Sequence, residues 1–173
     1  YLIGDNVITP KEHAKYYTEK IVRLPNCYLP FDNKRVLPEK HFTREDFGLP
    51  ENAFVMAAFH KPHKITIKEA ESWSKILLKI KEGVLWISSS NVIAEDNLIN
   101  FFIDKGISGE RIVFAKRLSK EDDHLARHLC ADLFIDTFNY NAQSTALDSL
   151  WLGLPIVTLL GKSFASRVCS SCL

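Results

Sequence analysis

From about Leu49 onward, two periodicities alternate along the chain. Short apolar runs that are typical of buried strands occupy residues 53–59, 84–87, 111–115, 132–135 and 155–160. Between these runs, apolar residues recur at three- and four-residue steps, which is the spacing of an amphipathic helix. The pattern therefore predicts strands and helices in alternation.

Helices are predicted over residues 66–81, 93–105, 120–129 and 144–152. Thr66 and Glu69 form a capping box at the start of the first helix, and Gly153 ends the last one. Strand–helix alternation with short connections indicates a Rossmann-like α/β lobe, with a parallel sheet and helices on both faces. Because ligands bind beyond the carboxyl ends of such strands, functional residues are expected just after Phe59, Ala115 and Ile135.

The first 46 residues follow another pattern. Thr9, Pro10 and Glu12 are typical of a helix start, and the helix is expected to run to about Ile21. Prolines then indicate an extended linker over residues 24–38. We therefore divide the chain into a helical and extended linker segment, residues 1–46, and a Rossmann-like lobe, residues 47–173.

Composition narrows the function classes. Of the 173 residues, 46% are hydrophobic and 25% charged, as in a soluble globular protein, and the net charge is +1. A nucleic-acid binder would normally have a basic excess, and no apolar stretch approaches the roughly 20 residues that span a membrane. Neither a signal peptide nor an initiator Met begins the chain. The four cysteines form no disulfide framework, so we expect a reducing, cytoplasmic setting.

The loop before the last predicted helix is a candidate anion site. No GxGxxG and no P-loop follows a strand, which argues against a common dinucleotide enzyme or a P-loop ATPase. Instead, Ser144 and Thr145 start a helix, where free backbone N–H groups and two hydroxyls suit a phosphate. The alternative is that Ser144 only caps the helix. Asp148, one turn on, either reaches ribose hydroxyls or only favours the helix dipole.

Two further segments follow predicted strands. Lys61 and Lys64 come directly after the first strand, where they either neutralise a diphosphate or belong to a solvated loop. A basic and histidine-rich stretch, residues 116–128, follows the third strand. His60, His63, His124 and His128 form an alternative zinc site, but the lysines around them disfavour a divalent cation. The CxxC spacing of Cys169 and Cys172 lacks a second ligand pair and indicates no metal or redox site.

Several longer motifs together resemble one family. The run over residues 132–158 reads DLFIDTFNYNAQSTALDSLWLGLPIVT, and GKSFASRV follows at residues 161–168. Shorter matches are LPENAFV at residues 49–55, the loop 59–65, VLW at residues 84–86 and RIVF at residues 111–114. These motifs are similar to the catalytic domain of O-linked N-acetylglucosamine transferases, especially the bacterial, tetratricopeptide-linked and SPINDLY-like members. The resemblance covers nearly the whole chain.

This resemblance implies the C-terminal lobe of a two-lobed GT-B enzyme. Such an enzyme is inverting and metal-independent, and it moves a sugar, here expected to be N-acetylglucosamine, from a UDP-sugar to Ser or Thr of proteins. Lys64 would stabilise the departing diphosphate and act as the catalytic residue. The other substrate-binding positions carried over are Lys61, Lys120, His124, Arg127, Gln143, Ser144, Thr145 and Asp148. Among them, Ser144 and Thr145 would bind phosphate, Asp148 and Lys120 the ribose, and His124 and Arg127 the uracil.

Two positions depart from the family pattern. Lys61 stands where many relatives have Gln or Asn, and Gln143 where many have His. An alternative is therefore a UDP-sugar-binding or regulatory module without transfer activity, and a zinc-dependent hydrolase rests on the histidines alone. Expected partners are a protein or peptide acceptor, an N-terminal catalytic lobe and tetratricopeptide repeats, with no cofactor, nucleic acid or membrane. Alone, residues 1–173 are expected to fold but not to transfer sugar.

Overall fold

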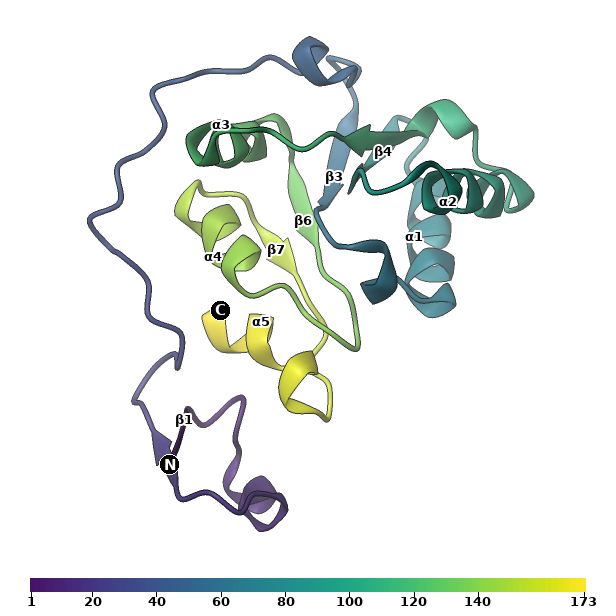
Figure 1. Cartoon of the computed structure of the whole chain (residues 1–173). Coiled ribbons are helices and arrows are strands. Elements are labelled where there is room, and N and C mark those ends of the chain that lie inside the picture. Colours follow the sequence, from purple (N-terminus) through teal and green to yellow (C-terminus); the bar gives the residue numbers. More distant parts are fainter.

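A five-stranded parallel sheet forms the centre of the structure, a computed structural model that describes all residues 1–173 (Figure 1). Its strands are β3 (Phe54–Ala58), β4 (Gly83–Ser88), β5 (Ile112–Ala115), β6 (Leu133–Ile135) and β7 (Ile156–Val157). They lie in the order β5-β4-β3-β6-β7, and Met56 of β3 pairs with Leu85 on one side and Leu133 on the other. The predicted parallel sheet is confirmed. From β3 the chain adds β4 and β5 on one side, and it then returns to add β6 and β7 on the other side. The strand order therefore reverses between β3 and β6.

Helices cover both faces of this sheet, as predicted (Figure 1). Helices α1 (Ile67–Lys79) and α2 (Val92–Asp104) lie on one face. The other face carries α4 (Ser144–Trp151) and α5 (Val168–Cys172), with α3 (Glu121–Ala126) alongside α4. The capping box of Thr66 and Glu69 at α1 is present. No helix is long and apolar enough to cross a membrane.

Strand β3 shows why the sheet has two cores. Successive side chains of a strand point to opposite faces. Val55 and Ala57 therefore pack with Trp86 and Phe134 on the α4 face, and Met56 packs with the other cluster, beneath α1 and α2. Both clusters are buried, so the lobe has a hydrophobic core on each side of the sheet.

Some predicted boundaries are wrong. Helix α3 ends at Ala126 and continues as the 3₁₀ helix Arg127–Cys130, while β7 holds two residues in place of the predicted 155–160 run. The pairing of Phe134 with Ile156 and Ile135 with Val157 accounts for β7, because β6 offers no longer partner.

The predicted helix over residues 10–21 is also wrong. A 3₁₀ helix covers only Lys11–Tyr16, and the chain then forms strand β2 (Ile21–Arg23), which pairs in parallel with β1 (Leu2–Gly4). Tyr17 already has extended backbone dihedrals. A helix does start near the predicted point, but Pro10 is its N-cap and no side chain caps it, because the Thr9 hydroxyl donates to the carbonyl oxygen of Asp5, at 2.8 Å. Strand pairing then ends this helix early.

Residues 24–43, called the connecting segment below, contain no helix or strand and run along one side of the lobe to η2 (Glu45–Phe47) (Figure 1). Arg44 anchors its end through a two-pronged ion pair with Asp132, at 2.8 and 2.9 Å. At its start, Tyr28 donates its backbone N–H to Asp5, whose carboxylate also accepts from the hydroxyl of Ser171 in α5. Polar contacts thus tie residues 1–46 to the lobe.

Candidate functional site

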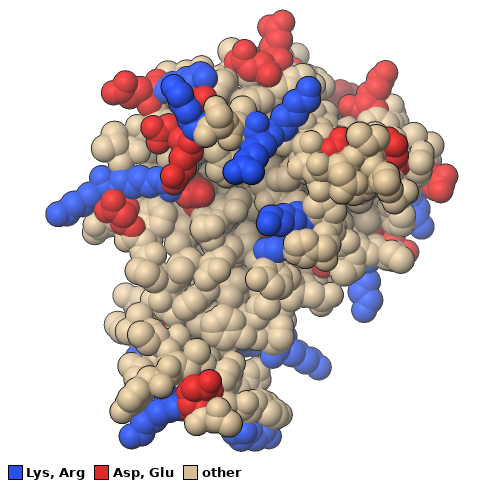
Figure 2. Space-filling model, viewed as in Figure 1, with Lys and Arg blue, Asp and Glu red and all other residues tan.

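A cavity of about 330 Å³ lies where β3 and β6 end, at the reversal of strand order. This is the edge at which open α/β sheets bind ligands. Its polar walls come from the loops after the two strands, and its apolar wall comes from the connecting segment and the C-terminal segment. The lining residues are Tyr28, Phe59, His60, Lys61, Lys64, Tyr140, Asn141, Ala142, Gln143, Ser144, Thr145, Phe164, Ala165 and Val168. In Figure 2, basic side chains gather near the middle of the face shown, and a mostly uncharged surface separates them from the charged lower end.

Lys61 and Lys64 are brought into this cavity by the turn after β3. Pro62 starts a 3₁₀ helix, Pro62–Lys64, which turns the chain back so that both lysines line the cavity. The Lys64 ammonium lies 4.0 Å from the ring centroid of Tyr140 and 3.4 Å from the carbonyl oxygen of Asn141. Burial lowers the pKa of Lys64, because the charged form loses hydration. An anion in the cavity would compensate for that loss.

Asp136, directly after β6, fixes the loop that forms the opposite wall. Its Oδ1 accepts the backbone N–H groups of Thr137 and Ala142, at 2.8 and 2.7 Å, and its Oδ2 accepts the hydroxyl of Thr158. The carboxylate is buried, so these bonds form in a low-dielectric setting that strengthens them. These hydrogen bonds connect the beginning and the end of the loop over residues 137–143 and fix its conformation.

Glu69 holds the same loop from the other side. The carboxylate that caps α1 also accepts the backbone N–H of Phe138, at 2.8 Å. Glu69 is fully buried, and its hydrogen bonds lower its pKa although burial opposes this. Glu69 thus joins α1 to the loop that forms the cavity wall. The capping motif by itself predicts only its contact with Thr66.

Helix α4 begins at Ser144, with Gln143 at the cap position. The alternative that Ser144 only caps the helix is wrong, because Ser144 is the first helical residue and no side chain caps α4. Gln143 instead directs its amide to the Tyr28 hydroxyl, at 2.6 Å. The first N–H groups of α4 therefore stay available to a ligand, together with the hydroxyls of Ser144 and Thr145 beside the cavity.

The remaining predicted site residues lie beside the cavity and do not line it. Lys120 stands at the start of α3, and His124 follows one turn later. The rings of His124 and Phe59 are 6.3 Å apart, and the Arg127 guanidinium lies 4.4 Å above the Phe59 ring. Phe59 itself lines the cavity, so its ring connects this group with the cavity wall.

Arg127 is buried, and the backbone of the chain fixes its guanidinium. It is 4% exposed, and its Nη1 donates to the carbonyl oxygen of Lys116, at 2.9 Å. Nearby, burial and the charge of Arg127 lower the pKa of His124 to about 4, so its imidazole is neutral at pH 7. A neutral imidazole offers one donor and one acceptor to a ligand.

Asp148 forms an ion pair that the sequence did not indicate. Arg35 of the connecting segment donates to its carboxylate at 2.6 Å, and also to Glu121 of α3 at 2.9 Å. The Asp148 and Arg35 side chains are 16% and 21% exposed, so this contact is largely shielded from solvent. Arg35 therefore joins α3 and α4 next to His124.

Two of the four histidines of the alternative zinc site contact backbone carbonyl groups. His60 Nε2 lies 2.9 Å from the carbonyl oxygen of Ile135, and His128 Nδ1 lies 2.9 Å from that of His124. No group of three or more His, Cys, Asp or Glu side chains is placed to hold a metal ion. All four cysteines are free thiols, Cys169 and Cys172 among them.

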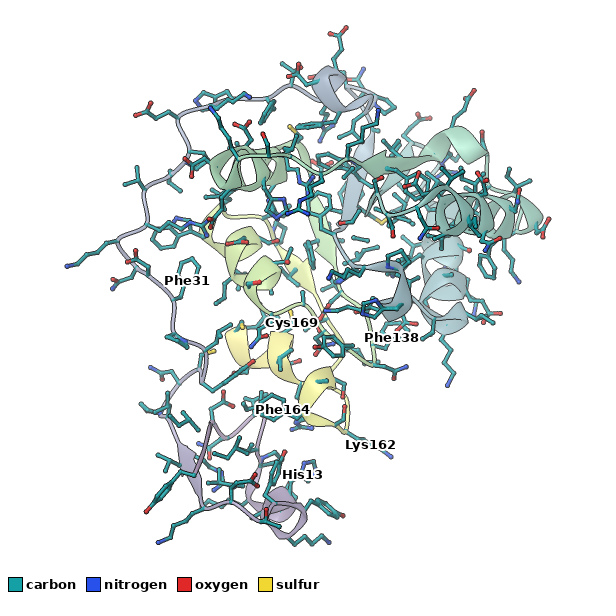
Figure 3. All side chains as sticks on the ribbon, viewed as in Figure 1. His13, Phe31, Phe138, Lys162, Phe164 and Cys169 are labelled. Atoms are coloured by element: carbon teal, nitrogen blue, oxygen red, sulfur yellow. The ribbon has the colours of Figure 1, made fainter.

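Tyr28, Tyr140 and Phe164 line the cavity without having been predicted, and Arg35 contacts a predicted site residue. Figure 3 shows Phe164 in the C-terminal segment, between Cys169 and His13 of the N-terminal segment. Tyr140 lies inside the loop after β6, so proximity to Ser144 was an available signal. Tyr28 and Arg35 carry no local signal, because their partners are 115 and 113 residues away.

Comparison with known proteins agrees with this architecture. The family model for glycosyl transferase family 41 matches residues 40–173. A probable UDP-N-acetylglucosamine–peptide N-acetylglucosaminyltransferase of Arabidopsis thaliana, SEC, is 32% identical over 99% of this chain and 18% of its own length. The corresponding Caenorhabditis elegans enzyme is 34% identical over 75% of this chain and 11% of its own length.

Structural similarity extends over the entire chain. A mutant O-GlcNAc transferase of Thermobaculum terrenum superimposes on it with a TM-score of 0.86 and 31% identity, covering 100% of this chain and 32% of that one. The chain spans less than a fifth of the curated relatives it matches, at 18% for SEC. With its five-stranded parallel sheet and the matched region, the chain belongs to glycosyl transferase family 41, as a C-terminal lobe of the O-GlcNAc transferase type.

Proposed function

We propose that this chain is the nucleotide-sugar-binding part of an inverting, metal-independent glycosyltransferase that moves N-acetylglucosamine from UDP-N-acetylglucosamine to Ser or Thr of proteins. One observation carries the proposal: Lys61, Lys64 and the uncapped N-terminus of α4 converge on one cavity. Two ammonium groups and a helix N-terminus neutralise a diphosphate without a divalent cation. The names of the relatives support the donor and the acceptor class.

The two groups of site residues would divide the donor between them. Lys61, Lys64, Ser144 and Thr145 would bind the diphosphate in the cavity. Beyond Phe59, the nucleoside would contact Lys120, His124, Arg127 and Asp148. The ring of Phe59 lies between the groups and offers an apolar surface to the base or the ribose.

Lys64 would carry the largest share of catalysis in this lobe. Negative charge grows on the β-phosphate as the sugar departs, so a partly desolvated ammonium stabilises the transition state more than the ground state. The N–H groups of α4 would act on the same oxygens. The acceptor site would need a second catalytic lobe, and tetratricopeptide repeats are its expected companions, in the cytoplasm.

A second candidate function is donor binding without transfer. Gln143 is tied to Tyr28, and Asp148 to Arg35, so two positions proposed for the donor already have partners in the chain. A regulatory module would use the same cavity and would not need a second lobe.

Isothermal titration calorimetry with the 173-residue chain tests donor binding. UDP is expected to bind with and without EDTA, and to bind more weakly to Lys64→Ala. Lys68→Ala, on the exposed surface of α1, is the matched control. Absence of UDP binding, or binding only with a divalent cation, contradicts the proposal. Transfer of labelled sugar by a protein in which this lobe is joined to its second lobe separates the enzyme from the regulatory module.

A further inference from the structure

We propose that Tyr28 and Gln143 together recognise the sugar of the donor, and that Tyr28 determines its specificity by holding the Gln143 amide in place. This inference rests on the proposed function. It assigns a sugar-recognising role to Tyr28, a residue of the connecting segment, and a paired role to Gln143. Their joint placement on the cavity wall is the basis of the argument.

The hydrogen bond between the two residues leaves a defined set of groups for a ligand. Gln143 Nε2 donates to Tyr28 Oη at 2.6 Å. The Gln143 amide oxygen then remains as an acceptor, and the Tyr28 hydroxyl remains as a donor. Burial raises the pKa of Tyr28 to about 12, so the hydroxyl keeps its proton at physiological pH.

Tyr28 is itself fixed from two sides. Its backbone N–H donates to Asp5 at 2.9 Å, and the same carboxylate accepts the backbone N–H groups of Val7 and Ile8. Its ring meets the edge of the Phe164 ring, with centroids 5.6 Å apart and planes at 74°. A side chain with two rotatable bonds, held in this way, can orient a flexible glutamine at little entropic cost.

The cavity separates charged from neutral contacts. Lys61, Lys64 and the first turn of α4 form its cationic part, while Tyr28, Phe164, Ala165 and Val168 form a neutral and largely apolar part. Gln143 directly precedes Ser144, so it stands between the two parts. A sugar attached to a diphosphate at α4 would therefore meet Gln143 and Tyr28 first.

The chemistry of the pair matches an acetamido sugar. The acetamide of an N-acetylhexosamine offers one N–H donor and one carbonyl acceptor, which complement the Gln143 oxygen and the Tyr28 hydroxyl. A hexose with a hydroxyl at that position lacks the carbonyl, so the Tyr28 hydroxyl would lose its acceptor. A site built for hydrogen bonds discriminates best against analogues that leave its own groups unpaired.

Titration calorimetry on the 173-residue chain, which has its own core on both sides of the sheet, tests the inference. Affinities for UDP, UDP-N-acetylglucosamine and UDP-glucose are compared in the wild type, Tyr28→Phe and Gln143→Ala. Tyr28→Phe removes one hydroxyl and keeps the ring against Phe164. The control is Tyr16→Phe, which removes the hydroxyl of an exposed tyrosine that does not line the cavity.

We expect the wild type to prefer the acetamido donor, and both variants to lose about 3- to 10-fold of that preference, as for one or two neutral hydrogen bonds. UDP affinity should stay within about twofold, and Tyr16→Phe should keep the wild-type preference. If UDP binds but the wild type prefers neither sugar, or Tyr28→Phe keeps the preference, the inference is wrong and the proposed function stands. If UDP does not bind to the wild type, both are wrong.

Discussion

Arg35 and Asp148, 113 residues apart, form an ion pair of 2.6 Å that fastens the connecting segment to α4. The guanidinium also reaches Glu121, so it crosses from α4 to α3 beside His124. The Asp148 carboxylate, which is proposed to bind ribose, is thus paired with the Arg35 guanidinium. Because that cation offsets its charge, Asp148 can stand near an anionic nucleotide at lower electrostatic cost.

Arg35→Ala should weaken both the fold and nucleotide binding. Removal of Arg35 leaves Asp148 partly buried without its charge partner, and we expect the free energy of unfolding in urea to fall by about 1.5–3 kcal/mol. UDP affinity should fall as well, because the uncompensated carboxylate repels the diphosphate. Lys40→Ala is the control: its pair with Asp123 is more exposed and should contribute less than about 1 kcal/mol. Equal losses in the two variants would contradict the shielded character of the Arg35 pair.

Lys64→Ala should lower turnover more than it weakens donor binding. The substitution removes the ammonium that faces the growing charge on the β-phosphate, and we expect turnover to fall on the order of 100-fold or more. The measurement is steady-state transfer by the lobe joined to its second lobe, with thermal unfolding to show that the fold persists. Lys61→Ala is the comparison, since Lys61 lines the same cavity. A folded Lys64→Ala enzyme with the wild-type rate would transfer the role to Lys61.

Asp136→Ala should loosen the loop before α4. The substitution leaves the buried N–H groups of Thr137 and Ala142 without an acceptor, which should cost about 3 kcal/mol of unfolding free energy. Amide exchange over residues 137–143 should accelerate. Asp136→Asn keeps one acceptor oxygen for the two N–H groups, so its unfolding free energy should decrease much less. The account of the loop fails if Asn and Ala variants are equally unstable.

Stability should fall as the pH drops below about 6.5. His128 is fully buried, and burial lowers its pKa to about 3. Between pH 6.5 and that value the unfolded chain binds a proton that the folded chain excludes, so the unfolding free energy decreases by about 1.4 kcal/mol per pH unit for such a histidine. His124, with a pKa of about 4, adds to the same trend.

His128→Leu tests this linkage. The variant should show a smaller loss of unfolding free energy than the wild type between pH 7 and 5, whatever its stability at pH 7. Urea denaturation at several pH values gives the two slopes. Identical slopes would show that His128 does not titrate as its burial requires.

Most of the lobe could be predicted from local patterns in the sequence. Strand and helix periodicities are local, and a capping box joins residues only three positions apart, so both can be recognised in the sequence. The parallel sheet, the helices on both faces and the edge that bears Lys64 and Ser144 followed from them. Resemblance to the transferases added proposed roles for Lys120, His124 and Arg127 that spacing did not supply.

The other features depend on contacts between residues far apart in the chain, which local patterns do not contain. The helix expected up to Ile21 gave way to β2, because pairing with β1 outweighed helix propensity. Tyr28 and Arg35 lie in a segment without periodicity, so only its path over the lobe brings them to Gln143 and Asp148. Phe59 lines the cavity and also contacts Trp86 and Arg127, because β3 ends directly before it. Contacts between side chains more than 100 residues apart depend on how helices, strands and loops pack together. A local sequence pattern contains no information about that packing.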